Sequence, residues 1–353
     1  MSKLLSVIIP LYNSSKWLPK CLDSVLNQDV DEDVLEIICI NDGSPDNSAE
    51  IVLTYQAKHP QTFVLLEQEN QGPSGARNNG MRHATGKYLC FVDPDDYVEP
   101  NVFGGLLKQM EEQGLDMLRF NYQIVDEGYK PVPKRDFERK FDYSPNIMPG
   151  PVFLADRLDI ACNIWRYIYR VDLIVQNEIW CFTGDYFDDT PWLPMVLLKT
   201  NRIGICDTVV YDYQERGDSL VKTMNPKAVK RKNDGYLLLI CLLKEEMEAV
   251  QEGKTNYPNM KVFSTIKLDT ITREKIVLWY KMMIAHSSLS LFTNTAISDS
   301  KSIKSNLKRL RELKVFPLSQ HRASEKNRRK IWLINTFPLT MMRLLQLKFK
   351  LKN

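Results

Sequence analysis

Apolar and polar positions alternate between two periods over the first 122 residues. Short continuous apolar runs are typical of strands buried on both faces, whereas apolar residues spaced three and four apart are typical of helices. The first pattern predicts strands at residues 6–10, 35–40, 63–66, 88–92 and 117–122. The second predicts helices at residues 17–26, 47–59, 73–84 and 101–113. This alternation indicates a Rossmann-like α/β fold, a mostly parallel sheet with helices on both faces.

The rest of the chain gives weaker signals. Residues 125–150 are rich in Pro, Lys, Asp and Tyr and are predicted to form an irregular loop. Helical segments are predicted at residues 153–158, 165–169 and 193–198, a strand at 209–213, and helices from Lys227 onward. We therefore expect an α/β domain over residues 1–225, with halves 1–125 and 126–225, and a helical C-terminal region over residues 226–353.

Composition and cysteine usage narrow the class of protein. The chain has 353 residues, 44% of them hydrophobic and 26% charged, which is ordinary for a globular protein with a large core. Its seven cysteines are scattered and form no CxxC pair, so neither a zinc site nor a disulfide framework is expected. The sequence offers no signal-peptide pattern and no long uncharged apolar stretch, and we expect a cytoplasmic protein.

Polar residues gather where the predicted strands end, at Tyr12-Asn13, Asp42-Gly43-Ser44, residues 70–72 and residues 93–96. In open α/β sheets such ends converge on one crevice that binds a ligand. Asp93, Asp95 and Asp96 follow the fourth strand so closely that their carboxylates repel one another unless a cation lies among them. Hard oxygen ligands suit Mg²⁺ or Mn²⁺. The alternative is an acidic turn before the next helix.

Five segments at these strand ends resemble, in order, the successive motifs of glycosyltransferase family 2, which has the GT-A fold. The segments are SVIIPLYN (residues 6–13), NDGS (41–44), NQG (70–72), ARN (76–78) and FVDPDD (91–96). The resemblance is strong over residues 4–125 and weaker over residues 160–220. It implies an inverting transferase that takes a sugar from a nucleotide sugar, with a UDP-sugar as the expected donor.

The resemblance also implies roles for single residues. Pro10, Tyr12 and Asn13 would lie against the nucleotide, and Asp42 would accept hydrogen bonds from the edge of the base. Arg77 would bring its planar cation near the nucleotide. Taken alone, however, Asp42-Gly43-Ser44 is typical of a turn or helix cap, and Arg77 of a surface arginine.

The acidic run corresponds to the DXD motif of the family. Asp95 would bind a divalent metal ion, Mn²⁺ or Mg²⁺, directly, and Asp93 would reach the ribose or a metal-bound water. The ion would stabilise the departing pyrophosphate. Asp96 would support the ligands indirectly or cap a helix.

A general base is expected well downstream of the acidic run. Asp189 is the candidate, and Asp188 takes the place of the usual Glu, which leaves the assignment between the two less secure. A helix N-cap before Pro191 is the alternative.

Arg216 is a candidate to approach the pyrophosphate, with an exposed loop arginine as the alternative. Trp165 and Tyr169 could stack on acceptor sugars, although core packing fits their spacing better.

The expected reaction is transfer of a hexosyl or N-acetylhexosaminyl group to a hydroxyl of a glycan or lipid-linked glycan. An α-linked donor would give a β-linkage. Family-level expectation places the reaction in capsule, lipopolysaccharide or exopolysaccharide synthesis. Two alternatives remain, an inactive sugar-nucleotide-binding protein and a sugar nucleotidyltransferase. The intact acidic pairs disfavour the first, and the absence of glycine in residues 11–16 disfavours the second.

Charge is unevenly distributed along the chain. Residues 301–353 carry 15 Lys/Arg and two Asp/Glu, whereas residues 1–300 carry 32 basic and 42 acidic residues. This basic tail is expected to contact anionic lipid at the inner face of the cell membrane, with Trp332, Phe337, Leu344 and Phe349 entering the interface. The alternative is a basic helical subdomain packed on the acidic body. Nucleic acid is not an expected partner.

Overall fold

The structure is a computed structural model that describes residues 3–132, 144, 146–158, 161–183, 189–215, 225–255, 264–295, 300–321, 323–336 and 338. The chain divides into two compact units. Unit 1 consists of Met1–Phe153, Arg157–Gly184 and Trp192–Ser219. Unit 2 consists of Leu154–Asp156, Asp185–Pro191 and Leu220–Asn353.

The centre of unit 1 is a mixed sheet that has nine strands in the described part of the chain. The strands are β1 (Leu5–Leu11), β2 (Leu35–Asp42), β3 (Phe63–Gln68), β4 (Tyr88–Phe91), β5 (Tyr97–Val98), β6 (Met117–Val125), β7 (Ile147–Met148), β8 (Tyr167–Arg170) and β9 (Ile203–Gln214). Their order is β3-β2-β1-β4-β8-β6-β9-β5, with β7 paired to β9. The pairs β1–β2, β2–β3, β1–β4 and β6–β9 are parallel, as expected for this fold class.

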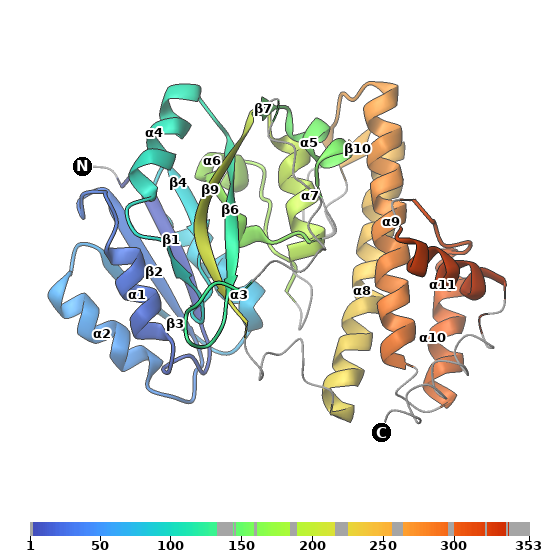
Figure 1. Cartoon of the computed structure of the whole chain (residues 1–353), viewed down its shortest axis with the longest axis horizontal. Coiled ribbons are helices and arrows are strands. Elements are labelled where there is room, and N and C mark those ends of the chain that lie inside the picture. The colour runs from blue at the N-terminus through green and yellow to red at the C-terminus, as the bar shows by residue number, and fades with distance from the viewer. Residues whose placement is uncertain are drawn as a thin grey trace. The chain divides into compact units, whose positions relative to one another are not determined.

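Helices cover both faces of this sheet, which confirms the predicted α/β architecture. They are α1 (Leu18–Leu26), α2 (Ser48–Lys58), α3 (Gly72–His83), α4 (Phe103–Gln113), α5 (Gly150–Asp156), α6 (Val171–Val175) and α7 (Asp189–Lys199). In Figure 1, α1, α2 and α4 lie on one side of the sheet, and α3 and α6 lie on the other. The apolar side chains of β1 are fully buried between these layers.

One predicted element of unit 1 is wrong. Residues 165–169 do not form a helical segment: Ile164–Arg166 is a single 3₁₀ turn, and Tyr167–Arg170 is strand β8. The strand lies between β4 and β6 and is antiparallel to both. Aromatic residues fit a pleated, buried surface well, and this available position in the sheet decides their conformation.

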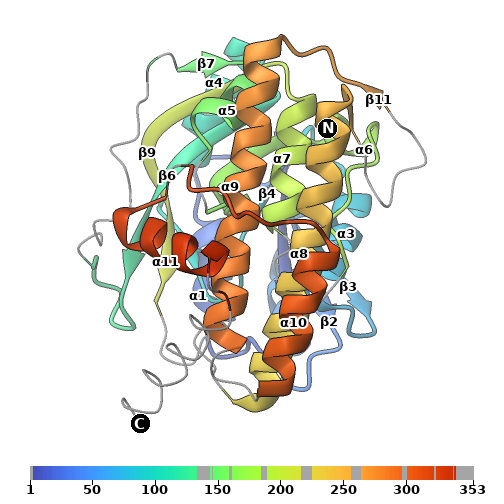
Figure 2. The same cartoon turned by 90° about the vertical axis from the view of Figure 1, so that its right-hand side faces the viewer.

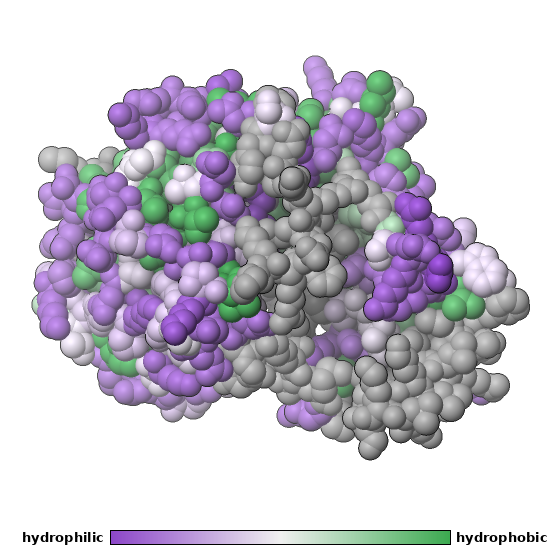
Figure 3. Space-filling view, viewed as in Figure 1, coloured by the Kyte–Doolittle hydropathy of each residue, from purple (hydrophilic) through white to green (hydrophobic). Residues whose placement is uncertain are grey.

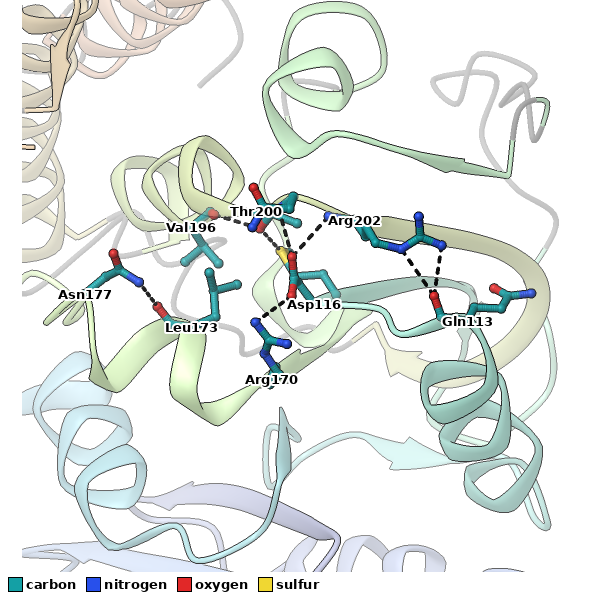
Figure 4. A network of polar contacts seen from close by, with 10 residues as sticks. Gln113, Asp116, Arg170, Leu173, Asn177, Val196, Thr200 and Arg202 are labelled. Carbon is teal, nitrogen blue, oxygen red and sulfur yellow. Dashed lines mark hydrogen bonds and ion pairs between the residues drawn. The ribbon is translucent and has the colours of Figure 1, made fainter. Parts of the chain in front are cut away.

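A polar network holds the edge of the sheet where β6 and β9 begin (Figure 4). Asp116 precedes β6, and its Oδ2 accepts hydrogen bonds from the backbone N–H groups of Asn201 and Arg202 at 2.8 and 3.1 Å. Its Oδ1 forms an ion pair with Arg170 at 2.8 Å. The network joins β6, β8 and β9 at the edge opposite the carboxyl ends of β6 and β9, so it stabilises the scaffold without occupying the expected ligand-binding edge.

Unit 2 is mostly helical in its described part, as the sequence predicts. Its elements are α8 (Pro226–Gln251), β10 (Lys254–Thr255), β11 (Ser264–Thr265), α9 (Thr270–Thr295), α10 (Ser300–Glu312) and α11 (Glu325–Thr336). The helices α8, α10 and α11 all contact α9, and Figure 2 shows α8 and α10 running beside it. Among the described residues, no helix is both long enough and apolar enough to cross a membrane.

Candidate functional site

The loops after β1 and β2 are tied together by Asp46. Its Oδ1 accepts hydrogen bonds from the hydroxyls of Ser44 and Ser48, both at 2.6 Å, and its Oδ2 accepts one from the backbone N–H of Ser15 at 2.8 Å. Burial opposes ionisation, but the bonds from Ser44, Ser48 and Ser15 outweigh it and hold the pKa of Asp46 well below its usual range. The sequence reasoning missed this residue; the signal was a carboxylate placed two residues from a serine on either side.

This network fixes the residues predicted to meet the nucleotide base. Pro10 is buried within β1, whereas the Tyr12 side chain is 55% exposed just beyond the strand. Asn13 has a left-handed φ of 52°, and its backbone N–H donates to Ser44 Oγ at 2.7 Å. The backbone that carries the exposed Tyr12 ring is therefore held at the carboxyl ends of β1 and β2, where a planar ligand could stack on the ring.

Asp42 is the last residue of β2 and is 2% exposed. Its Oδ1 accepts hydrogen bonds from Gln68 Nε2 at 2.7 Å and from the backbone N–H of Gln71 at 2.8 Å. Gly43 follows with φ at +65°, a conformation that glycine adopts without strain. Asp42 thus anchors the start of α3, as the turn-or-cap interpretation predicts. Both bonds end on Oδ1, so this anchoring does not engage Oδ2.

Arg77 joins α3 to the acidic turn, residues 93–96. Its Nη2 lies 2.7 Å from Asp93 Oδ1, and the Arg77 side chain is only 7% exposed. The surface-arginine interpretation is therefore wrong. The neighbouring Asn78 makes two bonds to the backbone of Cys181, at 2.7 and 2.8 Å, so α3 also holds the segment that precedes residue 184.

The three carboxylates of the acidic turn have different environments. Asp93 and Asp95 are partly exposed, whereas Asp96 is 2% exposed. Asp96 accepts hydrogen bonds from the hydroxyl of Tyr211 and from the backbone N–H of Gln214, both at 2.8 Å. Burial, together with the negative charges of Asp95 and Asp93, raises the pKa of Asp96 well above its usual value. Asp96 is a buried anchor and caps no helix, since α4 begins only at Phe103.

The donor set suits a hard divalent cation that is shared with a ligand. Among the described residues, no group of three or more His, Cys, Asp or Glu side chains is placed to hold a metal ion by itself. Mg²⁺ and Mn²⁺ are commonly held by one or two carboxylates together with substrate phosphate oxygens. Asp93 and Asp95 supply two partly exposed carboxylates of this kind, so the residues present fit such an ion when a diphosphate completes its coordination.

The predicted general base, Asp189, lies in a different segment from the acidic turn. Asp189 is the first residue of α7, and it belongs to a stretch grouped with unit 2. Three residues later, Trp192 is buried in unit 1, with its ring 5.8 Å from that of Phe91 on β4. Asp188 and Arg216 lie outside the described residues. Trp165 and Tyr169 are 5% and 0% exposed and are core residues, as their spacing favours.

Comparison with known proteins agrees with the family that the motifs at the strand ends indicate. The family model for glycosyl transferase family 2 matches residues 6–157. An uncharacterized glycosyltransferase of Escherichia coli (strain K12), YibD, is 30% identical over 315 residues, covering 85% of this chain and 88% of that protein. The minor teichoic acid biosynthesis protein GgaA of Bacillus subtilis (strain 168) is 26% identical over 299 residues, covering 82% of this chain and 60% of that protein.

Solved structures show the same fold. S. aureus TarS, residues 1–349 in complex with UDP-GlcNAc, has a TM-score of 0.71 at 19% identity, covering 99% of this chain and 92% of that chain. The mannosyltransferase PcManGT of Pyrobaculum calidifontis, in complex with GDP-Man and Mn²⁺, has a TM-score of 0.54 at 16% identity, covering 98% of this chain and 88% of that chain. The motifs at the strand ends, the GT-A fold and the relatives agree, and the chain belongs to glycosyl transferase family 2 and is a glycosyltransferase.

Proposed function

We propose that this glycosyltransferase moves a sugar from a UDP-sugar to a hydroxyl of a glycan or lipid-linked glycan during synthesis of a cell-surface polysaccharide. The observation that carries the proposal is the joining of two strand ends through α3. The backbone of Gln71, at the start of α3, bonds to Asp42 at the end of β2, and Arg77, further along α3, pairs with Asp93 after β4. A teichoic acid biosynthesis protein among the relatives supports this class of product.

The base and the negative charge of a UDP-sugar have chemical counterparts in unit 1. Asp42 would accept a hydrogen bond from the N–H of the base, using the oxygen that does not hold Gln71. The exposed ring of Tyr12 would stack on the base, and Asn13 would approach from the same loop. Arg77 would bring positive charge toward the nucleotide while it fixes Asp93. The UDP and UDP-GlcNAc bound in TarS support this choice of donor.

The partly exposed pair Asp93 and Asp95 would hold a divalent cation, with Asp95 as the direct ligand. When bound, such an ion would supply Lewis-acid stabilisation of the departing diphosphate. The Mn²⁺ of the mannosyltransferase neighbour supports the use of a metal. Arg216 would add a further positive charge toward the diphosphate.

Asp189 would take the proton of the acceptor hydroxyl, with Asp188 as the alternative base. Its place at the first turn of α7 supports this role, because the free backbone N–H groups of a helix start can hold and orient a carboxylate. Attack on the anomeric carbon in one displacement would invert its configuration. An α-linked donor would therefore give a β-linked product.

The proposal is tested by release of nucleoside diphosphate from a panel of sugar nucleotides, with glycan acceptors and with or without Mn²⁺ or Mg²⁺. We expect turnover with one UDP-sugar, lost on chelation of the metal. Asp95→Ala and Asp189→Asn should lower kcat at least 100-fold. Asp207→Asn, which changes an exposed carboxylate on β9, is the matched control and should keep wild-type turnover. Unchanged turnover in Asp95→Ala and Asp189→Asn would refute the site.

We further propose that the basic C-terminal region contacts anionic membrane. In the described part of this region, Lys304, Lys308, Arg328 and Arg329 are exposed. Trp332, on α11, is 55% exposed among basic residues. Figure 3 shows hydrophilic residues gathered over α11. A tryptophan flanked by cations is typical of helices that lie in a membrane interface. Contact there would bring the enzyme to a lipid-linked acceptor at the inner face of the cell membrane.

A further inference from the structure

The acidic turn connects two strands of unit 1 that are not neighbours in the sheet. It leaves the sheet at β4 and returns at β5, and the strands β8, β6 and β9 lie between those two in the sheet. The sheet's own backbone hydrogen bonds therefore do not determine the shape of residues 93–96. Three carboxylates within four residues also repel one another, which favours opening of the turn. The side chain of Asp93 is held by Arg77, but the path of the backbone needs a separate anchor.

Tyr211 of β9 supplies that anchor. It is 1% exposed, and its ring stacks on Trp165 with centroids 4.3 Å apart and planes inclined by 17°. The hydroxyl accepts a hydrogen bond from the backbone N–H of Asp93 at 3.0 Å and donates one to Asp96 Oδ2 at 2.8 Å. One rigid phenol thus holds both ends of the turn, which positions Asp95 between them.

The anchoring is shared with Asp96. Its Oδ1 accepts a hydrogen bond from the backbone N–H of Gln214 at 2.8 Å, and its backbone N–H donates to the carbonyl of Asp93 at 3.0 Å. The turn is therefore closed on itself and fastened to β9 at two residues, Tyr211 and Gln214. Both Asp96 oxygens and the Tyr211 hydroxyl therefore have hydrogen-bond partners, which restricts the geometry of the turn.

We propose that Tyr211 is a positioning residue. Its hydroxyl fixes the conformation of the acidic turn so that Asp93 and Asp95 face a diphosphate-bound divalent cation. The inference rests on the proposed function, because it assumes that this turn meets the metal and the diphosphate. Tyr211 itself does not touch the substrate. Its effect is transmitted through the backbone of Asp93 and the carboxylate of Asp96.

The test compares Tyr211→Phe with Tyr169→Phe in the full chain, by calorimetric titration of UDP with and without Mn²⁺. The first variant removes the hydroxyl and keeps the ring on Trp165. The second removes an equally buried hydroxyl that donates to the carbonyl of Ile164 at 2.7 Å, away from the turn. We expect Tyr211→Phe to weaken Mn²⁺-dependent UDP binding about tenfold and to leave binding without metal within about twofold of wild type. Tyr169→Phe should change neither.

Asp96→Asn keeps the size of the anchor but leaves it one acceptor oxygen instead of two. It gives a second reading should Tyr211→Phe fail to fold, and the same selective loss is expected. Wild-type Mn²⁺-dependent affinity in both variants overturns the positioning role. An equal loss with and without Mn²⁺ also overturns it, because it indicates a general structural role. Failure of Mn²⁺ to strengthen UDP binding in the wild type overturns the proposed metal site itself, and the positioning role with it.

Discussion

At the scale of single residues, the same side chain has three different environments, at Asp42, Asp93 and Asp96. Asp42 is buried at a strand end and holds the start of a helix. Asp93 is partly exposed and paired with a buried arginine. Asp96 is buried and bonded to a tyrosine hydroxyl and a backbone amide. The environment rather than the residue type therefore decides what each carboxylate holds in place.

Asp42→Asn provides a sharp test at this scale. An asparagine can keep one oxygen for Gln68 and Gln71, but its amide group would then face the N–H of a uracil ring, donor against donor. We expect UDP affinity to fall about tenfold while the thermal midpoint of unfolding changes little. Calorimetric UDP titration and thermal denaturation measure the two effects. Unchanged UDP affinity would contradict the assignment of Asp42 to the base.

At the scale of elements, the site depends on how closely α3 packs on β1 and β2. A Cβ atom at Gly80 would lie 2.5 Å from Ile8 Cγ2 and 2.9 Å from Ile40 Cδ1, both in the buried core. Only glycine allows this approach, and the approach places the start of α3 beside Asp42 and Arg77 beside Asp93. The packing of α3 is therefore a condition for the site.

Gly80→Ala should accordingly destabilise the protein by about 1–3 kcal/mol, because the core must shift to admit one methyl group. Gly105→Ala is the matched control on α4, where a new Cβ would meet nothing within 4 Å. That change should stabilise by about 0.5–1 kcal/mol, since alanine loses less conformational entropy in a helix. Urea denaturation measures both free energies of unfolding. Equal effects of the two substitutions would contradict the close packing of α3.

The edge formed by β5 and β9 gives stability a pH dependence. The pKa of Asp212 is raised to about 6, chiefly by burial; a hydrogen bond from Gln123 opposes the rise, and the nearby Glu99 carboxylate adds to it. Lys20 is the nearby cation and lies over the rings of Tyr97 and Tyr129. In the unfolded chain the carboxyl titrates near its usual value of about 3.9. The folded chain therefore keeps this proton to a higher pH than the unfolded chain does.

The free energy of unfolding should consequently fall as pH rises from about 4 to about 6, by about 1–2 kcal/mol once solvent screening is allowed for. Asp212→Asn cannot titrate at this position, so it should make this slope shallower. Asp207→Asn removes an exposed carboxylate of the same strand and should keep the wild-type slope. Urea denaturation at several pH values provides the comparison. A wild-type slope in Asp212→Asn would show that another group is responsible.

At the scale of the whole molecule, the chain combines an α/β unit that holds the proposed nucleotide site with a mostly helical unit that holds the described part of the basic tail. Excess positive charge in residues 301–353 contrasts with excess negative charge in the rest of the chain. This distribution of charge favours separate roles, in which one unit would bind the donor and the other would bind an anionic surface.

Vesicle flotation tests that division. We expect the full chain to float with anionic phosphatidylglycerol vesicles, to float less as salt is raised, and to remain unbound with neutral phosphatidylcholine vesicles. Trp332→Ala should weaken binding several-fold. Leu238→Ala removes another exposed apolar side chain from the same unit, 46% exposed on α8, and should not weaken it. Equal failure of the full chain to float with either vesicle would remove the membrane proposal.

The order of amino acids is enough to predict the α/β alternation, because continuous apolar runs and helical spacing report burial locally. It also determined the candidate residues at the strand ends, because their motifs are contiguous. The tertiary structure decided the features that depend on distant partners. One is the strand at Tyr167–Arg170, which forms because there is a position for it between β4 and β6. Another is the anchoring of Asp96 by Tyr211, which lies 115 positions later in the chain. Local pattern encodes burial and periodicity, but which carboxylate is an anchor depends on contacts formed only when the chain folds.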